Sequence, residues 1–225
     1  YNFAWSSYIG YMDLLLQHIH QETGIAQFIE TTASKYNLPE ETLHKFTDAV
    51  ISSLLGAVLL QGDTPETEKL LSSYYSKISE EDIEPAKRTD LTIGILNKIF
   101  NNKLTEFYSI LSEYNNIELK NVDDMTIILS ELFIKQIPRF MASEKYSING
   151  LLGHLLGERD YFIDQIPDAV IDLLNISSKH NIGQNISADA VVVSNAVRYT
   201  LLREKRESEE ANRKKSWFEK ILKKG

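Results

Sequence analysis

The residues closest to a metal-binding pattern are His18, His20 and Glu22, which alternate with other residues near the start of the chain. On a helix, a step of two residues turns a side chain by about 200°, so these three side chains point apart. Metal ligands that share one helix need spacings of three or four residues. We therefore predict no metal site here, and we expect His154, which lies in a leucine-rich stretch, to be a partly buried helix residue.

Four aspartates, Asp160, Asp164, Asp168 and Asp172, recur at intervals of four residues. An unbroken helix would stack these like charges, which costs stability. Because Pro167 interrupts the helix, we expect the aspartates to be solvated surface residues; a site for a cation or a basic partner is the alternative.

Sequence patterns of the common catalytic sites are missing. The chain contains no cysteine, which excludes disulfides, thiolate metal sites and cysteine nucleophiles. It also lacks the calcium loop, the P-loop, the dinucleotide-binding glycine pattern, the nucleophile elbow and the zinc-protease pattern. We can name no catalytic, cofactor-binding or metal-binding residue, and we expect a protein that is not an enzyme and carries no cofactor.

Length, composition and apolar spacing predict an all-α fold. The chain has 225 residues, 43% of them hydrophobic and 25% charged, with only 10 Gly and 5 Pro. So few turn-forming residues disfavour a many-stranded sandwich or barrel. Leu43, Phe46, Val50, Leu54 and Val58 recur at helical spacing. The longest uncharged apolar run, 49–62, has 14 residues, against roughly 20 for a transmembrane helix, and predicts a buried core helix.

The chain matches itself when it is shifted by 79 residues without a gap. A short helix, an Asn-containing turn and a longer core helix then coincide, which predicts an internal duplication. Chance alignment of two amphipathic helices is the alternative. The superposed apolar pairs are Ile25 and Leu104, Phe28 and Phe107, Leu38 and Ile117, Leu43 and Val122, Phe46 and Met125, Val50 and Leu129, Leu54 and Phe133, and Val58 and Ile137.

We divide the chain into three parts. Residues 1–180 form the duplicated helical domain, with repeats at about 12–66 and 91–145 followed by 147–176. Residues 181–187 resemble a linker. Residues 188–225 form a charged helix, capped by Ser187 and ending in a basic amphipathic tail. Its apolar face, formed by Ala190, Val191, Val193, Val197 and Leu201, fades after Leu202, so we expect the rest to project into solvent.

The stretch 151–157, Leu-Leu-Gly-His-Leu-Leu-Gly, followed by 163–167, Ile-Asp-Gln-Ile-Pro, and by Leu173-Leu174, resembles the bacterial domain of unknown function 937 (DUF937). The likeness extends back through 94–100 and 37–41 and covers roughly residues 12 to 176. This chain has fewer small residues and more charge than the family pattern. The resemblance implies a divergent, all-helical, internally duplicated bacterial domain, and it brings no catalytic residues.

Charge is divided unequally along the chain, which has a net charge of −8. Residues 198–225 hold ten basic and five acidic residues, a net charge of +5, so residues 1–197 carry −13. A basic amphipathic tail fits a protein partner or an anionic membrane surface, whereas a strongly acidic body disfavours nucleic acid. A solvated helix is the alternative reading. The expected contact residues are Trp217, Phe218, Ile221, Leu222, Lys214, Lys215, Lys220, Lys223 and Lys224, with Trp5 and Tyr8 as a second set.

These observations favour a non-enzymatic binding or scaffolding module, bacterial and either cytoplasmic or membrane-associated. No basic and apolar leader is present at Tyr1, which predicts no signal peptide. A small-ligand-binding protein or an enzyme with a pocket between the repeats, near Gly150–Gly157, is the alternative. A third hypothesis is a homo-oligomer that associates through the N-terminal aromatic residues.

Overall fold

A computed structural model of the chain describes residues 15–21, 23–62, 64–69, 84–184 and 186–222, with the side chains of 212–222 left out. Within these residues the fold is all-α and contains no strand, which confirms the predicted fold class. The helices are α1 (Leu15–His20), α2 (Thr23–Tyr36), α3 (Glu40–Gln61), α4 (Pro65–Lys69), α6 (Pro85–Ile99), α7 (Leu104–Asn115), α8 (Leu119–Glu144), α9 (Ile148–Phe162), α10 (Asp168–Leu173) and α11 (Ala188–Leu222), with short 3₁₀ turns η3 (Ile163–Gln165) and η4 (Lys179–Asn181).

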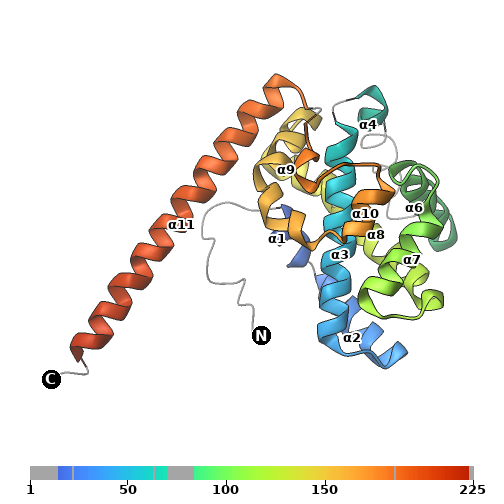
Figure 1. The fold of residues 1–225 in the computed structure, drawn as a ribbon, viewed down its shortest axis with the longest axis horizontal. Helices are drawn as coiled ribbons and strands as arrows, with labels where there is room; N and C mark the ends of the chain where they lie inside the picture. The colour runs from blue at the N-terminus through green and yellow to red at the C-terminus, as the bar shows by residue number, and fades with distance from the viewer. Residues whose placement is uncertain (1–14, 22, 63, 70–83, 185, 223–225) are drawn as a thin grey trace.

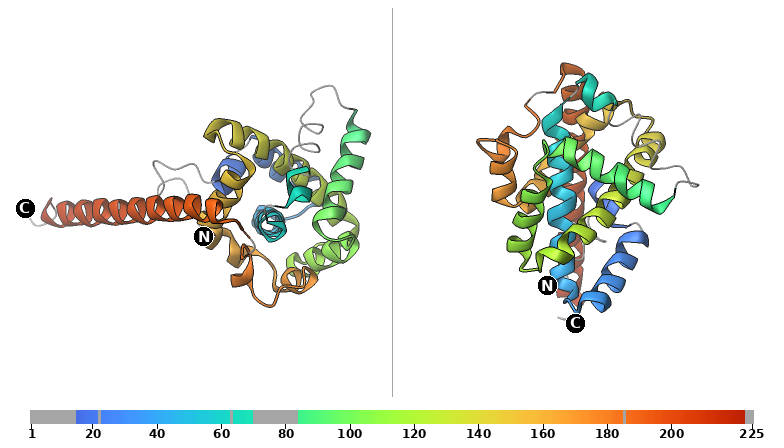
Figure 2. Two further views of the ribbon diagram at one scale, coloured as in Figure 1. Left: turned by 90° about the horizontal axis from the view of Figure 1, so that it is seen from above. Right: turned by 90° about the vertical axis from the view of Figure 1, so that its right-hand side faces the viewer.

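Helix α3 is the centre of the body. Viewed along its axis, it lies inside a ring formed by the other helices, while α11 extends away from that ring (Figure 1, Figure 2). Contacts with α2, α6, α7, α8, α9 and η3 surround it. Every residue from Ala49 to Leu59 is buried, including Ser52 and Ser53. Such a helix is apolar on all sides because no side faces water.

One helix among the described residues, α3, is long and apolar enough to cross a membrane by length and composition alone. In the fold, 78% of its most apolar window is buried inside the protein. This burial agrees with the core helix predicted from the run 49–62.

Helix boundaries in the two predicted repeats coincide at the shift of 79 residues. The ends of α1, α2 and the start of α3 fall at positions that correspond to the ends of α6, α7 and the start of α8. Asn37 and Asn116 occupy equivalent positions and share a left-handed conformation, with φ of 52° and 54°. Asparagine tolerates this conformation better than most residues, so it can end a helix where the chain turns back.

The packing of the two copies is also reciprocal. Helix α2 contacts α8 while its counterpart α7 contacts α3, and α1 contacts α8 while its counterpart α6 contacts α3. Of the sixteen apolar residues paired by the shift, all are buried except Leu38, which is partly buried against the core. The aromatic rings of Phe100 and Phe107 stack within this core, with centroids 4.0 Å apart.

Two local expectations differ from the structure. Pro138 neither ends nor precedes the end of its helix, because α8 continues to Glu144 with Pro138 inside it. The expected linker at 181–187 is tied to the body instead of being loose. The Arg159 guanidinium donates hydrogen bonds to the carbonyl oxygens of His180 and Ile182, at 3.3 and 3.1 Å, and Ile182 is buried.

Candidate functional site

Helix α11 packs on α9 along a pair of glycines. A Cβ atom added at Gly153 would lie 2.4 Å from the carbonyl oxygen of Ala190, and one at Gly157 would lie 2.6 Å from Val197 Cβ. Only glycine permits such a close approach of the two backbones. This geometry matches the close packing predicted for these glycines and fills the region where the alternative hypothesis placed a pocket.

The start of α11 is fixed by local hydrogen bonds as well as by packing. The Ser187 hydroxyl accepts a hydrogen bond from the Ala190 N–H at 3.4 Å, which confirms the predicted cap. Arg198 donates to the carbonyl oxygen of Leu156 at 3.3 Å. Val197 and Leu201 form a small apolar cluster with Tyr161 of α9. The body therefore sets the direction in which α11 leaves it.

Glu204 is the last buried residue on the α9 side of α11. It is 5% exposed, and neither of its carboxylate oxygens has a hydrogen-bond partner among the described residues. Burial raises the pKa of Glu204, and burial followed by the nearby Glu204 charge raises the pKa of Tyr161. Described residues after Glu204 are exposed or partly exposed, so the contact with the body ends there.

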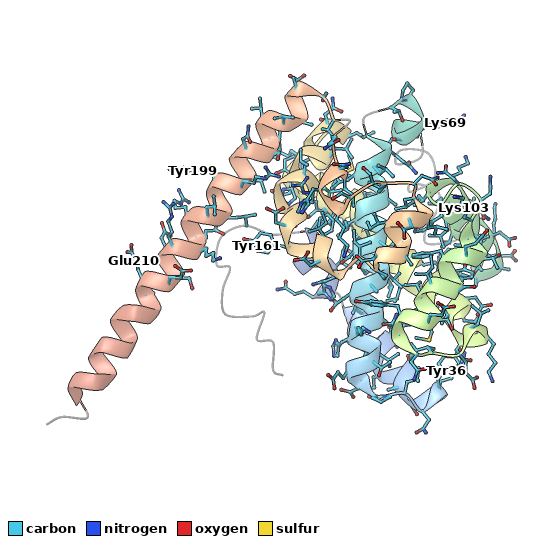
Figure 3. The ribbon with its side chains drawn as sticks, in the orientation of Figure 1. Tyr36, Lys69, Lys103, Tyr161, Tyr199 and Glu210 are labelled. Carbon is cyan, nitrogen blue, oxygen red and sulfur yellow. The ribbon has the colours of Figure 1, made fainter. Side chains whose placement is uncertain are left out.

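The opposite face of α11 carries apolar side chains that nothing in the described structure covers. Val192 is 69% exposed, Tyr199 71% and Leu202 57%, while Val191 at their edge is 40% exposed. Spacings of seven and three residues place Val192, Tyr199 and Leu202 on one side of the helix. We call these three residues the outer stripe. Figure 3 shows Tyr199 on the side of α11 turned away from the body and Tyr161 reaching toward α11 from α9.

The sequence-predicted contact residues lie at the far end of the same helix. Trp217, Phe218, Ile221, Leu222, Lys214, Lys215 and Lys220 fall on the helical backbone of α11, but their side chains are not described. Lys223, Lys224, Trp5 and Tyr8 lie outside the described residues. The outer stripe was missed from the sequence, where Val191 was placed on the apolar, inward face; the structure instead leaves Val191 partly exposed.

A second feature, a polar cluster, is buried on the other side of α9. Tyr146 Oη lies 3.2 Å from His154 Nδ1, and His154 Nε2 lies 4.0 Å from Glu158 Oε2. The rings of Phe140 and His154 meet edge to face, with centroids 4.9 Å apart. His154 and Glu158 are 1% and 0% exposed. His154 is therefore fully buried, where the sequence suggested partial burial.

Burial drives both ionisable groups of this cluster toward their neutral forms. It raises the pKa of Glu158 to about 8 and lowers the pKa of His154 to about 4. The backbone N–H groups of Leu15 and Leu16, at the start of α1, oppose part of the shift at Glu158. Neither carboxylate oxygen has a well-aligned hydrogen-bond partner among the described residues, so desolvation dominates.

The described residues bring together no cluster of three or more His, Asp or Glu side chains able to hold a metal ion. The histidine, glutamate and tyrosine near α9 have the chemistry of a proton relay, but neither His154 nor Glu158 meets solvent. The accessible feature is instead the outer stripe. Comparison with family models, curated proteins and solved structures finds no match to this chain.

Proposed function

We propose that this protein is a non-enzymatic binding module in which the helical body presents α11 as a docking arm. One observation carries the proposal: α11 has two apolar faces, and only one of them is covered by α9. Buried Val197 and Leu201 fix the arm to the body, while Tyr199 and Leu202 point away from it. Exposed apolar residues gathered on one helix face are typical of surfaces that bind a partner.

The charge pattern supports the same role. The body is acidic and the region from Arg198 onward is basic, so a negatively charged partner is attracted to the arm and repelled by the body. An anionic membrane surface and a protein are the two partner classes that fit a basic amphipathic helix. As a second part of the proposal, the chain is a divergent relative of the DUF937 family.

Co-sedimentation with vesicles of phosphatidylserine and phosphatidylcholine, at low and high salt, tests the membrane class. Light scattering on the same samples gives the mass of the protein. The variant Tyr199→Ser/Leu202→Ser removes most of the outer stripe without touching the side that packs on α9. Ile128→Ser is the matched control, since Ile128 is an exposed apolar residue of α8, 45% exposed.

We expect the stripe variant to reduce vesicle binding or self-association at least several-fold and the Ile128 control to leave both unchanged. A version ending at Ala211 retains all described packing of α11 on α9 and separates the tail from the stripe. If the whole chain neither binds vesicles nor associates at about 100 µM, the docking-arm proposal is wrong.

A further inference from the structure

We propose that the partner of α11 is a second copy of this chain, and that the two helices pair antiparallel. This inference rests on the proposed docking role of α11 and names its occupant. The evidence lies in the part of α11 that leaves the body, immediately after the outer stripe and the last buried residue, Glu204.

The exposed charges in this part of α11 are separated by sign. Arg203, Lys205 and Arg206 form a basic block, and Glu207, Glu209 and Glu210 form an acidic block directly after it. All six side chains are exposed. In a parallel pair with matched positions, the basic blocks of the two copies would face each other, and so would the acidic blocks.

An antiparallel pair reverses this outcome. When the two helices cross near the junction of Arg206 and Glu207, the basic block of each copy faces the acidic block of the other. Complementary charges along adjacent helices set their relative orientation, whereas like charges disfavour the alternative. The order of the blocks therefore favours one orientation of one partner, which is the chain itself.

The apolar residues fit the same arrangement. On each copy the outer stripe precedes the basic block, so the antiparallel partner crosses it with residues that follow its own acidic block. By sequence, that segment contains Trp217, Phe218, Ile221 and Leu222. Apolar residues would then lie at both ends of the paired region and complementary charges at its centre.

Pairing of charges within one helix is the competing explanation. Arg203 Nε lies 3.7 Å from Glu207 Oε1, one turn later on the same helix, and both side chains are largely exposed. Exposed pairs of this kind stabilise a helix only slightly. They also leave Tyr199 and Leu202 uncovered, so they do not account for the outer stripe.

Charge-reversal variants separate the two explanations by mass. In the first variant, Arg203→Glu/Lys205→Glu/Arg206→Glu, the whole region becomes acidic; in the second, Glu207→Lys/Glu209→Lys/Glu210→Lys, it becomes basic. Both variants lose the pairs within the helix. We expect light scattering to show a dimer for the natural sequence, a monomer of 25.7 kDa for each variant alone, and twice that mass for their equimolar mixture.

Engineered cysteines test the orientation, because the chain contains no cysteine of its own. Ser208→Cys lies near the proposed crossing point and should form an intermolecular disulfide under mild oxidation. Asn195→Cys lies far from it and should form such a disulfide only in a parallel pair. A cross-link at position 195 with none at position 208 would overturn the antiparallel arrangement.

The outcomes also separate this inference from the docking role itself. A natural chain that stays monomeric at 100 µM and binds anionic vesicles through the outer stripe overturns self-pairing and leaves the docking arm intact. A monomer that binds no vesicles overturns both. Dimerisation that disappears in Tyr199→Ser/Leu202→Ser and persists in Ile128→Ser supports both.

Discussion

Replacing Glu158 by glutamine should remove a dependence of stability on pH between acid and mildly alkaline conditions. The Glu158 carboxyl is 0% exposed, and burial raises its pKa from 4.5 to about 8. The folded state therefore binds this proton more tightly than the unfolded state does. The free energy of unfolding is greatest below pH 4.5, falls as the pH rises toward 8, and levels off above that value.

The expected size follows from the two pKa values. The interval from 4.5 to about 8, at about 1.4 kcal/mol per pH unit, corresponds to at most about 5 kcal/mol. About 3 kcal/mol of this would already be lost at pH 7. His154 acts in the opposite direction: its pKa is lowered from 6.5 to about 4, so its contribution is complete above 6.5 and is lost as the pH falls toward 4.

Urea unfolding of the natural chain and of Glu158→Gln, measured from pH 5 to pH 9, tests this reasoning. The glutamine amide faces the same backbone N–H groups and adds an offset that does not change with pH. The informative quantity is therefore the slope: the stability difference should move in favour of the variant by several kcal/mol across the range. Glu106→Gln, at an exposed position of α7, is the control. A difference that stays constant within about 0.5 kcal/mol would refute a neutral, buried Glu158.

Two further predictions concern the backbone. Gly153→Ala should destabilise the protein by about 1–3 kcal/mol and loosen α11, because the new Cβ would lie 2.4 Å from the carbonyl oxygen of Ala190. Gly94→Ala, in a helix with no atom within 4 Å of the new Cβ, should raise stability by about 0.5–1 kcal/mol in the same thermal unfolding assay; equal effects at the two glycines would contradict the packing argument. Asn116→Ala should cost about 1 kcal/mol and Asn116→Gly should not, because Asn116 has a φ of 54°; urea midpoints that rank the two variants in the opposite order would contradict this account.

Much of the fold could be predicted because its signals are local. Apolar spacing between Leu43 and Val58 identifies α3, and the same spacing repeated from Val122 onward identifies α8. The two asparagine turns follow from residues whose short side chains tolerate a left-handed backbone. What these signals do not contain is the assembly of the helices, and so the central place of α3 emerged only from the structure.

The two features of the candidate site were missed for different physical reasons. Val191, Val192 and Val193 are chemically identical in sequence, so nothing in their types tells which side of α11 the body covers. Glu158 precedes Arg159 and Asp160 in a charged run, and such runs are usually solvated. Only the approach of α1 to α9 removes the carboxyl from water, and that approach depends on residues far apart in the chain.

The position of α3 also has a consequence for synthesis of the protein. The ribosome produces α3 early, but α9, which completes its surroundings, ends 101 residues after Gln61, at Phe162. At about 5–20 residues per second, the most apolar helix of the chain waits about 5–20 seconds for its last neighbour. During that interval the nascent chain displays a segment that satisfies the length and hydropathy of a membrane span. Newly made chains therefore need a trigger-factor-like holdase or rapid partial collapse onto α2 to avoid aggregation.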